Sequence, residues 1–337
     1  MTAPLGRGRF LMSSAATAHA FWITQPGQGE ILEQQISDPR PGEAQIRTLY
    51  SAVSRGTESL VFLGRVPPGE FARMRAPFQE GEFPAPVKYG YISVGVVEAG
   101  PADWRGREVF CLFPHQTRYN VPLVAAHPIP RGVPAQRAVL AANLETAVNA
   151  LWDAGLRRGS RLAVIGAGTL GCLCAWLAHR HYDADVELID IDPARAGVAE
   201  SLGVAFALPA DARSDVPLIL HTSTTQAGLL TAIELAGFEA LILELSWFGD
   251  AQLRLPLGGA FHSRRLTLKA SQVGHVAPAM RGHATRHSRL RTALRLLTDP
   301  VLDVLIDSES TFDELPNVLA ELAGGQRRAI CHRINYE

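Results

Sequence analysis

The chain has 337 residues, 47% of them hydrophobic, and carries a formal net charge of −1 at pH 7. This length and composition allow two ordinary domains with well-filled cores. The near-zero charge argues against a general attraction to nucleic acid or to an anionic membrane, and no apolar run reaches the roughly 18 residues that span a bilayer.

The first residues predict no element of a fold. Residues 1–18 contain Arg7, Arg9 and an Ala-rich patch too short for a secretory signal, so we expect a disordered leader, with Met12 as an alternative start. Four cysteines are scattered along the chain, and Cys172 and Cys174 would lie on different sides of one helix. Neither a disulfide nor a paired metal site is easy there, so we expect a reduced, cytoplasmic protein.

Residues 19–134 are β-rich. Short apolar or alternating runs, which predict strands at 44–49, 92–99 and 108–113, are separated by Pro/Gly punctuation. This spacing is typical of a compact barrel-like domain.

From residue 135 the pattern changes to strands that alternate with helices. Such alternation predicts an α/β domain with a parallel sheet covered on both faces. We expect helices at 138–154, 169–181, 194–202 and 226–236, and strands at 162–165, 186–189, 218–221, 240–245 and 266–271. After Gly274 this order stops, and a helix at 288–297 precedes short elements that end at Tyr336.

A glycine motif opens the helix at 169–181. It consists of Gly166, Gly168 and Gly171, with Thr169 and Leu170 at the start of the helix. The first glycine permits a tight strand-to-helix turn, the second leaves room for a pyrophosphate, and the third lets the helix pack closely on the strand. The phosphates would lie over a helix N-terminus, which favours negative charge. The motif predicts a dinucleotide site, whereas a glycine-rich turn kept for packing alone is the structural alternative.

Asp190 indicates which nucleotide binds. It ends the strand after the glycine helix, where a carboxylate accepts hydrogen bonds from the adenosine ribose and repels a 2′-phosphate. Asp192 adds to that repulsion and is the better N-cap because Pro193 follows it, while Arg195 offsets it in part. We therefore predict NAD(H) rather than NADP(H).

These motifs in this order resemble the medium-chain dehydrogenase/reductase superfamily, which includes the zinc alcohol dehydrogenases. The resemblance covers about residues 19–336 and implies a GroES-like β-barrel domain (19–134 and 289–337) and a Rossmann nucleotide domain (135–288). Ser54–Glu58, Ser271–Gly274 and the closing segment resemble the branch that contains the bacteriochlorophyllide hydroxyethyl dehydrogenase.

The chain departs from the zinc pattern of that superfamily. Zinc members present Cys-Gly-Thr-Asp where this chain has Arg55-Gly56-Thr57-Glu58, and Gly-His-Glu where it has Gly90-Tyr91-Ile92. The third ligand position falls near Ala142, and only Cys111 lies where a structural zinc lobe would be. Because catalytic zinc needs three N, S or O donors, we predict that the chain binds no zinc.

Chemistry without the metal would fall to Arg55, Tyr91 and Glu58. Arg55 could act as a fixed cation on a developing oxyanion, and Tyr91 as hydrogen-bond donor or general acid. The resemblance implies that both face the interdomain cleft. The structural alternatives are a salt bridge between Arg55 and Glu58 and a packed Tyr91 whose hydroxyl bonds to backbone.

Further cofactor contacts are expected at the carboxyl edge of the sheet. His221 and Thr222 follow one strand and Trp247 follows the next, where doubly wound folds bind ligands. Thr146, beside Glu145 on the entering helix, could approach the nicotinamide. For each of these, a satisfied core or surface residue is the structural alternative.

Two further expectations concern partners. Residues 262–295 are locally basic, which could guide an anionic small-molecule substrate or could be a solvated, ion-paired surface. No nucleic-acid module is visible. The strand at 266–271 is expected to be the sheet edge, through which relatives form homodimers.

The sequence thus predicts a zinc-independent, NAD(H)-dependent oxidoreductase that acts on an alcohol/ketone pair or an activated double bond between the two domains. An NADPH-dependent enone or quinone reductase is the alternative within enzymes. A dinucleotide-binding protein without turnover is the alternative outside them.

Overall fold

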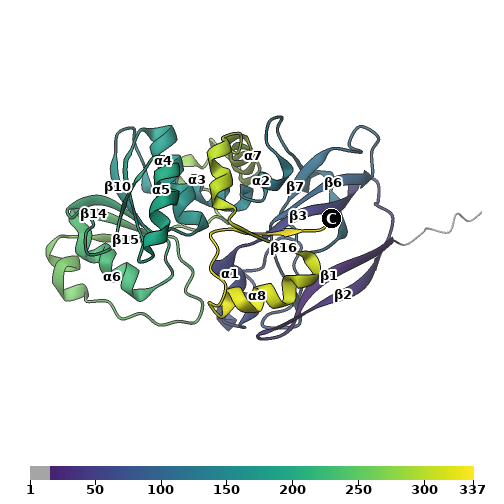
Figure 1. Cartoon of the computed structure of the whole chain (residues 1–337), viewed down its shortest axis with the longest axis horizontal. Coiled ribbons are helices and arrows are strands. Elements are labelled where there is room, and N and C mark those ends of the chain that lie inside the picture. The colour runs from purple at the N-terminus through teal and green to yellow at the C-terminus, as the bar shows by residue number, and fades with distance from the viewer. Residues whose placement is uncertain (1–15) are drawn as a thin grey trace, which may run out of the picture.

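A six-stranded parallel sheet organises one half of the computed structural model, which describes residues 16–337 (Figure 1). The strands run in the order β12-β11-β10-β13-β14-β15, and every neighbouring pair is parallel. The order reverses between β10 and β13, the position at which doubly wound folds bind ligands. The strands are β10 (Arg161–Ile165), β11 (Asp185–Ile189), β12 (Ala205–Ala207), β13 (Val216–His221), β14 (Ala236–Glu244) and β15 (Thr267–Ala270).

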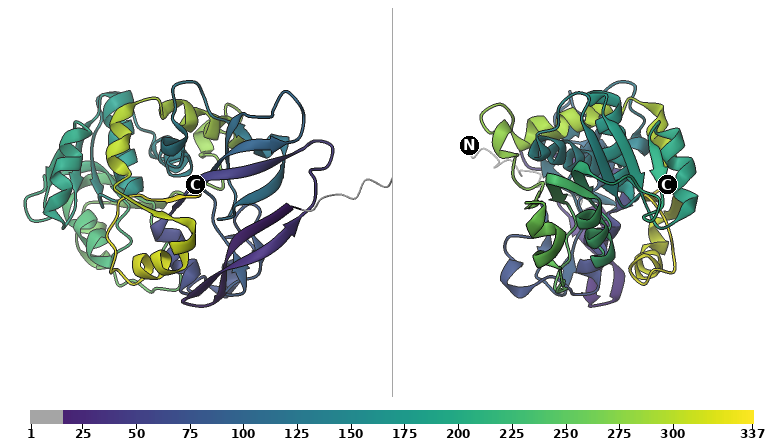
Figure 2. Two further views of the ribbon diagram at one scale, coloured as in Figure 1. Left: turned by 45° about the vertical axis from the view of Figure 1, so that its right-hand side comes forward. Right: turned by 90° about the vertical axis from the view of Figure 1, so that its left-hand side faces the viewer.

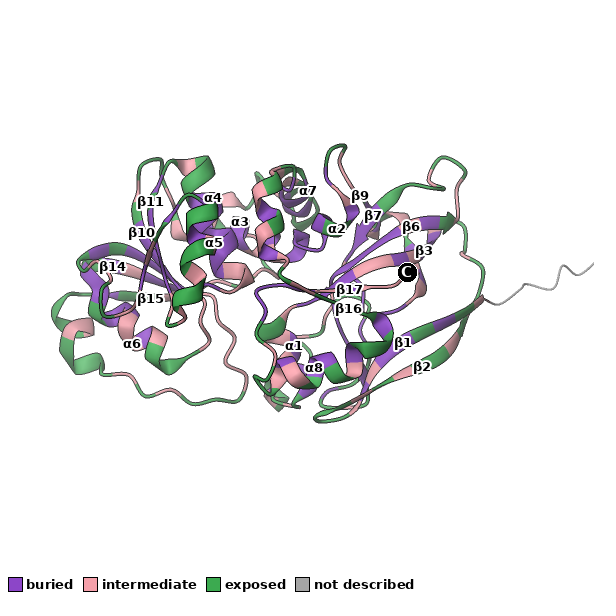
Figure 3. Ribbon diagram, viewed as in Figure 1, coloured by how far each residue is buried: buried purple, intermediate pink, exposed green. Residues whose placement is uncertain are grey.

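Helices cover both faces of this sheet because its strands are apolar on both sides. In β10, Leu162 and Val164 enter one core while Ala163 and Ile165 enter the other, as the two-residue period of a strand requires. The first core takes most of its helical residues from three helices, and the second is closed by a further helix (Figure 3). These helices are α3 (Ala141–Ala154), α4 (Thr169–Tyr182), α7 (Arg286–Leu296) and, on the second face, α6 (Gln226–Leu235). A shorter helix, α5 (Ala196–Ser201), precedes β12.

The other half of the molecule is built from two further sheets. One runs β2-β1-β5-β4, and the other runs β16-β17-β3-β6-β7-β9, with β8 paired to β3. The chain enters this half at β1 and comes back to it at β16 and β17, so both ends of the sequence contribute to one domain (Figures 1 and 2). The strands are β1 (Ala16–Gln25), β2 (Gln28–Ile36), β3 (Glu43–Val53), β4 (Glu80–Gly81), β5 (Val87–Lys88), β6 (Ser93–Ala99), β7 (Glu108–Cys111), β8 (Arg118–Pro122), β9 (His127–Pro128), β16 (Ser308–Thr311) and β17 (His332–Asn335).

Three helices accompany these strands. Helix α8 packs on α1, and the contact closes a core that includes Val61, Phe62 and Leu319. The three are α1 (Arg55–Phe62), α2 (Ala135–Ala138) and α8 (Leu315–Ala323). The two expected architectures, a doubly wound α/β domain and a β-rich barrel domain, are both present.

The structure corrects several sequence-based boundaries. The leader expected at 1–18 overlaps β1, since residues 16–18 pair with residues 34–36; residues 1–15, with the alternative start at Met12, lie outside the described part. The helix expected at 138–154 is broken after α2. Arg137, which lies in α2 just before the start of the expected helix, bonds Asp303 at 2.6 Å, a contact between residues 166 apart that local propensity cannot anticipate.

Strands β12 and β14 also differ from the sequence-based expectation. The short strand β12 was not expected, because its three residues give too little periodicity. Strand β14 begins at Ala236 rather than 240, through an irregular register with β13.

Two findings concern the cysteines and membrane-spanning helices. All four cysteines are buried and unpaired. Within residues 16–337, no helix has the length and apolarity needed to cross a bilayer.

A buried ion pair joins α7 to α3. Arg289, only 1% exposed, donates from Nε to Glu145 Oε1 at 3.0 Å and from one terminal nitrogen to Asn149 Oδ1 at 2.5 Å. It also donates to the carbonyl oxygens of Val273 and His275, which fixes the loop before α7. Burial raises the pKa of Glu145, and the guanidinium opposes that rise.

We predict that Arg289→Met destabilises the fold by about 3–5 kcal/mol, because it leaves the Glu145 carboxylate buried without a partner. The matched control is Arg158→Ala, which removes an exposed pair with Asp183 and is expected to cost at most about 1 kcal/mol. Urea unfolding followed by circular dichroism measures both. Equal effects would contradict the assignment of Arg289 as the structural link.

Candidate functional site

The glycine turn joins β10 to α4, and two of its glycines are required by the fold itself. Gly166 has φ +106°, and a Cβ there would lie 2.8 Å from the backbone nitrogen of Ser223. A Cβ at Gly171 would lie 1.8 Å from the carbonyl oxygen of Gly166. By contrast, a Cβ at Gly168 would meet no atom of the described chain within 4 Å. Internal packing therefore explains Gly166 and Gly171 but gives no reason for glycine at position 168.

The turn is tied to its neighbours by side chains that the sequence singled out. Thr222 Oγ1 lies within hydrogen-bond distance of the carbonyl oxygens of Ile165 (3.0 Å) and Gly166 (2.9 Å). Thr169 Oγ1 donates to the carbonyl of Ile330 in the C-terminal segment. Leu170 packs against the core shared by α3 and α4. Thr169 and Thr222 thus hold the turn between the sheet and the other domain.

Asp190 lies beside the glycine turn. Its Oδ2 accepts a hydrogen bond from the Ala167 amide at 2.7 Å, and its Oδ1 accepts one from the Asp192 amide at 2.9 Å. Each oxygen keeps a second lone pair for another donor. Asp192 caps the following turn through the Ala194 amide at 3.1 Å, as expected from the proline after it. Between the two acids, Ile191 is 84% exposed, an apolar side chain that the sequence analysis did not single out.

A cluster of charges lies where the two domains meet. Arg195 is 3.6 Å from Asp192 and 3.7 Å from Asp307, whose carboxylate accepts hydrogen bonds from the Ile330 and Cys331 amides. Arg55, at the start of α1, lies close to this cluster. Partial burial and then Arg195 lower the pKa of the Arg55 guanidinium, whereas Asp190 and Asp307 raise it. Among residues 16–337, Arg55 makes no ion pair within 4.0 Å, so its charge is open to an anionic ligand.

Tyr91 lies between the cores of the two domains and packs against both. The side chains of Ser54 and Thr57 lie near its hydroxyl and favour a lower pKa of Tyr91. Burial, and then the charge of Glu58, raise the pKa of Tyr91 to about 12. At neutral pH the phenol is therefore protonated and able to donate a hydrogen bond.

Glu58 does not pair with Arg55. Its Oε2 lies 2.8 Å from His115 Nε2, and its Oε1 accepts the Ser54 amide at 2.7 Å; the carboxylate is 3% exposed. His115 Nδ1 is 2.7 Å from Ser51 Oγ, which in turn lies 3.0 Å from the hydroxyl of Tyr336. Glu58 is thus the inner end of a buried polar chain that reaches the last residues of the protein. No local pattern indicated His115, which lies 57 positions from Glu58 along the chain.

A second polar chain lies at the carboxyl edge of the parallel sheet. His221 is fully buried, with Nδ1 2.7 Å from Glu244 Oε2 and Nε2 2.7 Å from Ser223 Oγ. Both ring nitrogens are therefore occupied, and the side chain that reaches partly into solvent here is Ser223. Ser223 follows one predicted strand and Glu244 lies near the end of another, but neither was assigned a role from the sequence.

The loop after β14 bridges the domains. Trp247 packs against the core of the barrel domain. Gly249 has φ +62°, and a Cβ there would lie 2.5 Å from the carbonyl oxygen of Arg65. Thr146, expected near the nicotinamide, is half-buried on α3 and donates to the carbonyl of Ala142 at 3.1 Å. The loop 247–249 therefore fixes one side of the domain junction.

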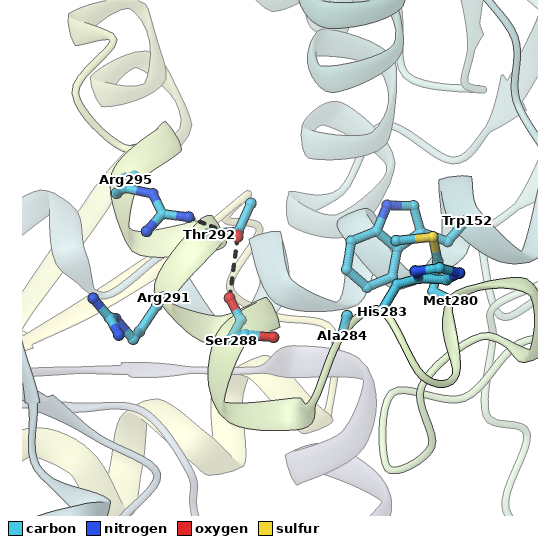
Figure 4. A pocket seen from close by; sticks show the side chains of 8 residues that line it. All are labelled: Trp152, Met280, His283, Ala284, Ser288, Arg291, Thr292 and Arg295. Atoms are coloured by element: carbon cyan, nitrogen blue, oxygen red, sulfur yellow. Dashed lines mark hydrogen bonds between the residues drawn. The ribbon is translucent and has the colours of Figure 1, made fainter.

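Many basic side chains of the segment at 262–295 make hydrogen bonds or ion pairs within the protein. Arg264 bonds two carbonyl oxygens, and Arg265, Lys269 and Arg289 pair with acids. Two of the other arginines, Arg291 and Arg295, line a cavity of about 330 Å³ between α3 and α7 (Figure 4). Its lining residues are Trp152, Met280, His283, Ala284, Ser288, Arg291, Thr292 and Arg295. None of them belongs to the glycine turn, to α1 or to the Tyr91 strand.

Arg55 and Tyr91 stand at two of the positions that were compared with zinc ligands above. Arg55 and Tyr91 offer a guanidinium and a protonated phenol, neither of which is a usual ligand. Within residues 16–337, no group of three or more His, Cys, Asp or Glu side chains is arranged to hold a metal.

Comparison with known proteins shows the fold. No family model matches the chain. A curated relative, the uncharacterized zinc-type alcohol dehydrogenase-like protein of Haemophilus influenzae, is 24% identical over 197 residues, which are 58% of this chain and 57% of the relative. The chain thus spans less than two thirds of the length of that relative.

Solved structures match over almost the whole chain. An Escherichia coli alcohol dehydrogenase complexed with NADH has a TM-score of 0.73 at 15% identity and covers 95% of this chain and 99% of its own. A putative zinc-binding dehydrogenase from Sinorhizobium meliloti bound to NADP has a TM-score of 0.73 at 15% identity, over 95% and 100%. The GroES-like and Rossmann architecture expected from the sequence is therefore confirmed.

Proposed function

We propose that the protein is a zinc-independent oxidoreductase that uses NAD(H). The observation that carries this proposal is Gly168. Two glycines of the turn are explained by close approach of protein atoms, but the third faces open space where a pyrophosphate would need room. The first turn of α4 would add its unpaired amides to bind the phosphates. The fold shared with an NADH complex and an NADP complex supports a nicotinamide dinucleotide.

The acids at the end of β11 favour NAD(H) over NADP(H). Asp190 is held in place by two backbone amides and keeps free lone pairs for ribose hydroxyls. A 2′-phosphate would meet both Asp190 and Asp192, and the nearby Arg195 is already shared between Asp192 and Asp307. The exposed Ile191 offers an apolar surface for an adenine ring.

In place of zinc, residues of this chain would supply a proton donor and a fixed positive charge. When bound, the dinucleotide would give or accept a hydride. Tyr91 would donate a hydrogen bond, or a proton, to the substrate oxygen. Arg55 would bind the negative charge of the cofactor's pyrophosphate, because its neighbours are Asp190 and Arg195. Glu58 would act by positioning, since it is buried against His115.

The substrate class that fits is an alcohol/ketone pair or an activated double bond. A closer relation to the bacteriochlorophyllide hydroxyethyl dehydrogenase branch rests on the three sequence segments alone. The basic cavity between α3 and α7 is set apart from the glycine turn and Tyr91, so it gives no support for an anionic substrate at this site.

We further propose a homodimer. Strand β15 is the last of its sheet, and within the described chain it pairs only with β14. Leu268 on this strand, Phe238 on β14 and Leu257 are 38%, 66% and 50% exposed, so an unpaired edge coincides with apolar side chains.

The first prediction concerns the cofactor. Chelator-treated protein should bind NADH at least tenfold more tightly than NADPH, and Asp190→Asn should reduce this difference. Energy transfer from tryptophan to the reduced nicotinamide measures both affinities, and metal analysis of the protein as purified, before any chelator is added, should find no stoichiometric zinc. Equal affinities would overturn the NAD(H) assignment, and failure to bind either nucleotide would overturn the oxidoreductase proposal.

The second prediction concerns the acid. Tyr91→Phe should lower turnover about 100-fold, with NADH affinity unchanged, because only the proton donor is lost. NADH consumption with a panel of ketones and quinones gives the rate. The control is Tyr89→Phe, a buried tyrosine whose ring lies 6.1 Å from that of Tyr91. An unchanged rate in Tyr91→Phe would remove Tyr91 from the mechanism.

The third prediction concerns assembly. Sedimentation equilibrium at micromolar concentration should give a dimer, and Leu268→Lys should weaken it at least tenfold because a charge would disrupt the paired edge. Val124→Lys, a change at a 73% exposed apolar residue of the other domain, is the control. A monomeric unmodified protein would refute the dimer.

A further inference from the structure

Ser223, His221 and Glu244 form a hydrogen-bonded triad that the proposed hydride chemistry does not use. The two links are both 2.7 Å, from Ser223 Oγ to His221 Nε2 and from His221 Nδ1 to Glu244 Oε2. The second carboxylate oxygen lies 2.9 Å from the same nitrogen and accepts the Ser246 amide at 2.7 Å, so Glu244 is fixed in position. His221 is fully buried, whereas Ser223 is partly exposed.

The backbone around Ser223 is shaped to hold this arrangement. Ser223 lies in the turn between β13 and α6, and the next residue, Thr224, has φ +56°, a conformation that non-glycine residues rarely adopt. A Cβ at Gly228 would lie 2.2 Å from Ser223 Oγ and 2.8 Å from His221 Nε2. Only glycine at position 228 leaves room for the serine–histidine contact above the first turn of α6.

When the imidazole is neutral, the number of protons on each group decides which atom donates in each hydrogen bond. Glu244 can only accept, so His221 donates from Nδ1 and must accept at Nε2. Ser223 therefore donates its only proton to His221. Thr225, whose Oγ1 lies 2.9 Å from Ser223 Oγ and accepts the Gly228 amide, donates to the serine. The remaining lone pair of Ser223 Oγ is free, which is the state of a nucleophile paired with a general base.

Two features beside the triad favour an acyl substrate. Gln226 and Ala227 begin α6 directly after its Thr225 cap, and the N-terminus of this helix would stabilise a developing oxyanion. The ring of Phe248 lies nearly parallel to that of His221, at 6.2 Å, and gives an apolar surface.

We propose that Ser223 is a nucleophile with its own acyl-transfer activity, and that it takes small activated carboxylic esters. Ser223 Oγ would bond to the ester carbonyl carbon while its proton passes to His221 Nε2. The tetrahedral adduct would expel the alcohol oxygen, which takes that proton. Water would then attack the acyl-serine by the same route, so the products are a carboxylic acid and an alcohol.

The experiment is labelling of nucleotide-free protein with a fluorophosphonate, followed by peptide mass spectrometry. Modification is expected at Ser223, and Ser223→Ala should abolish it. His221→Gln and Glu244→Gln should slow it at least 100-fold, with circular dichroism confirming the fold. Thr231→Val, on the exposed face of α6, should label at the normal rate. Absence of modification at Ser223 in the unmodified protein would overturn the proposal.

A second measurement separates activation from simple exposure. The four natural cysteines are buried, so Ser223→Cys introduces a single accessible thiol. The rate of its alkylation by iodoacetamide should have a pH midpoint at least one unit below the ordinary thiol value of about 8.5, because His221 stabilises the thiolate. Adding His221→Gln should restore the ordinary midpoint. A midpoint near 8.5 with His221 present would show that the histidine does not act as a base and would also overturn the proposal.

Discussion

The close approach of the glycine turn to the end of β13 is the constraint on which the rest of the structure depends. Gly166 lies against the backbone of Ser223, and Thr222 bonds the carbonyl oxygens at the end of β10. Any side chain at Gly166 or Gly171 would push α4 away from the sheet. This contact sets where the helix N-terminus points, and it also sets the turn that carries Ser223. The glycine turn and the serine triad are therefore two consequences of one packing contact at the switch point of the sheet.

The C-terminal segment connects this contact to the barrel domain. Thr169 at the start of α4 bonds the Ile330 carbonyl, and Asp307 bonds the amides of Ile330 and Cys331 while lying near Arg195. From there the chain enters β17, beside β3. The hydroxyl of Tyr336 then reaches Ser51 and, through it, the His115–Glu58 pair. The same segment contacts the charge cluster around Arg195 and the polar chain that ends at Glu58 on α1. A change in the charge cluster would therefore alter the position of α1, which carries Arg55.

The polar residues fall into two kinds. Glu58, His115, Glu145 and Arg289 are buried and fully engaged, so their partners position neighbouring elements and are costly to remove. Tyr91, Arg55 and Ser223 each keep a donor, a charge or a lone pair available at the domain junction or at the edge of the sheet. Physical availability, rather than burial or residue type, separates the groups that could act on a ligand from those that hold the fold.

The sequence by itself determined the elements that depend on local pattern. The order of strands and helices in the α/β half, the three glycine positions, the acid at the end of β11 and the Asp192 cap all follow from periodicity and short-range stereochemistry. Only the tertiary structure decided which polar groups meet. Glu58 pairs with His115 rather than with the nearby Arg55, Arg137 pairs with Asp303, and Glu244 on one strand meets His221 on its neighbour. These partners lie 23 to 166 residues apart along the chain. No local pattern encodes such distances, because they are set by strand order and by the packing of one domain on the other.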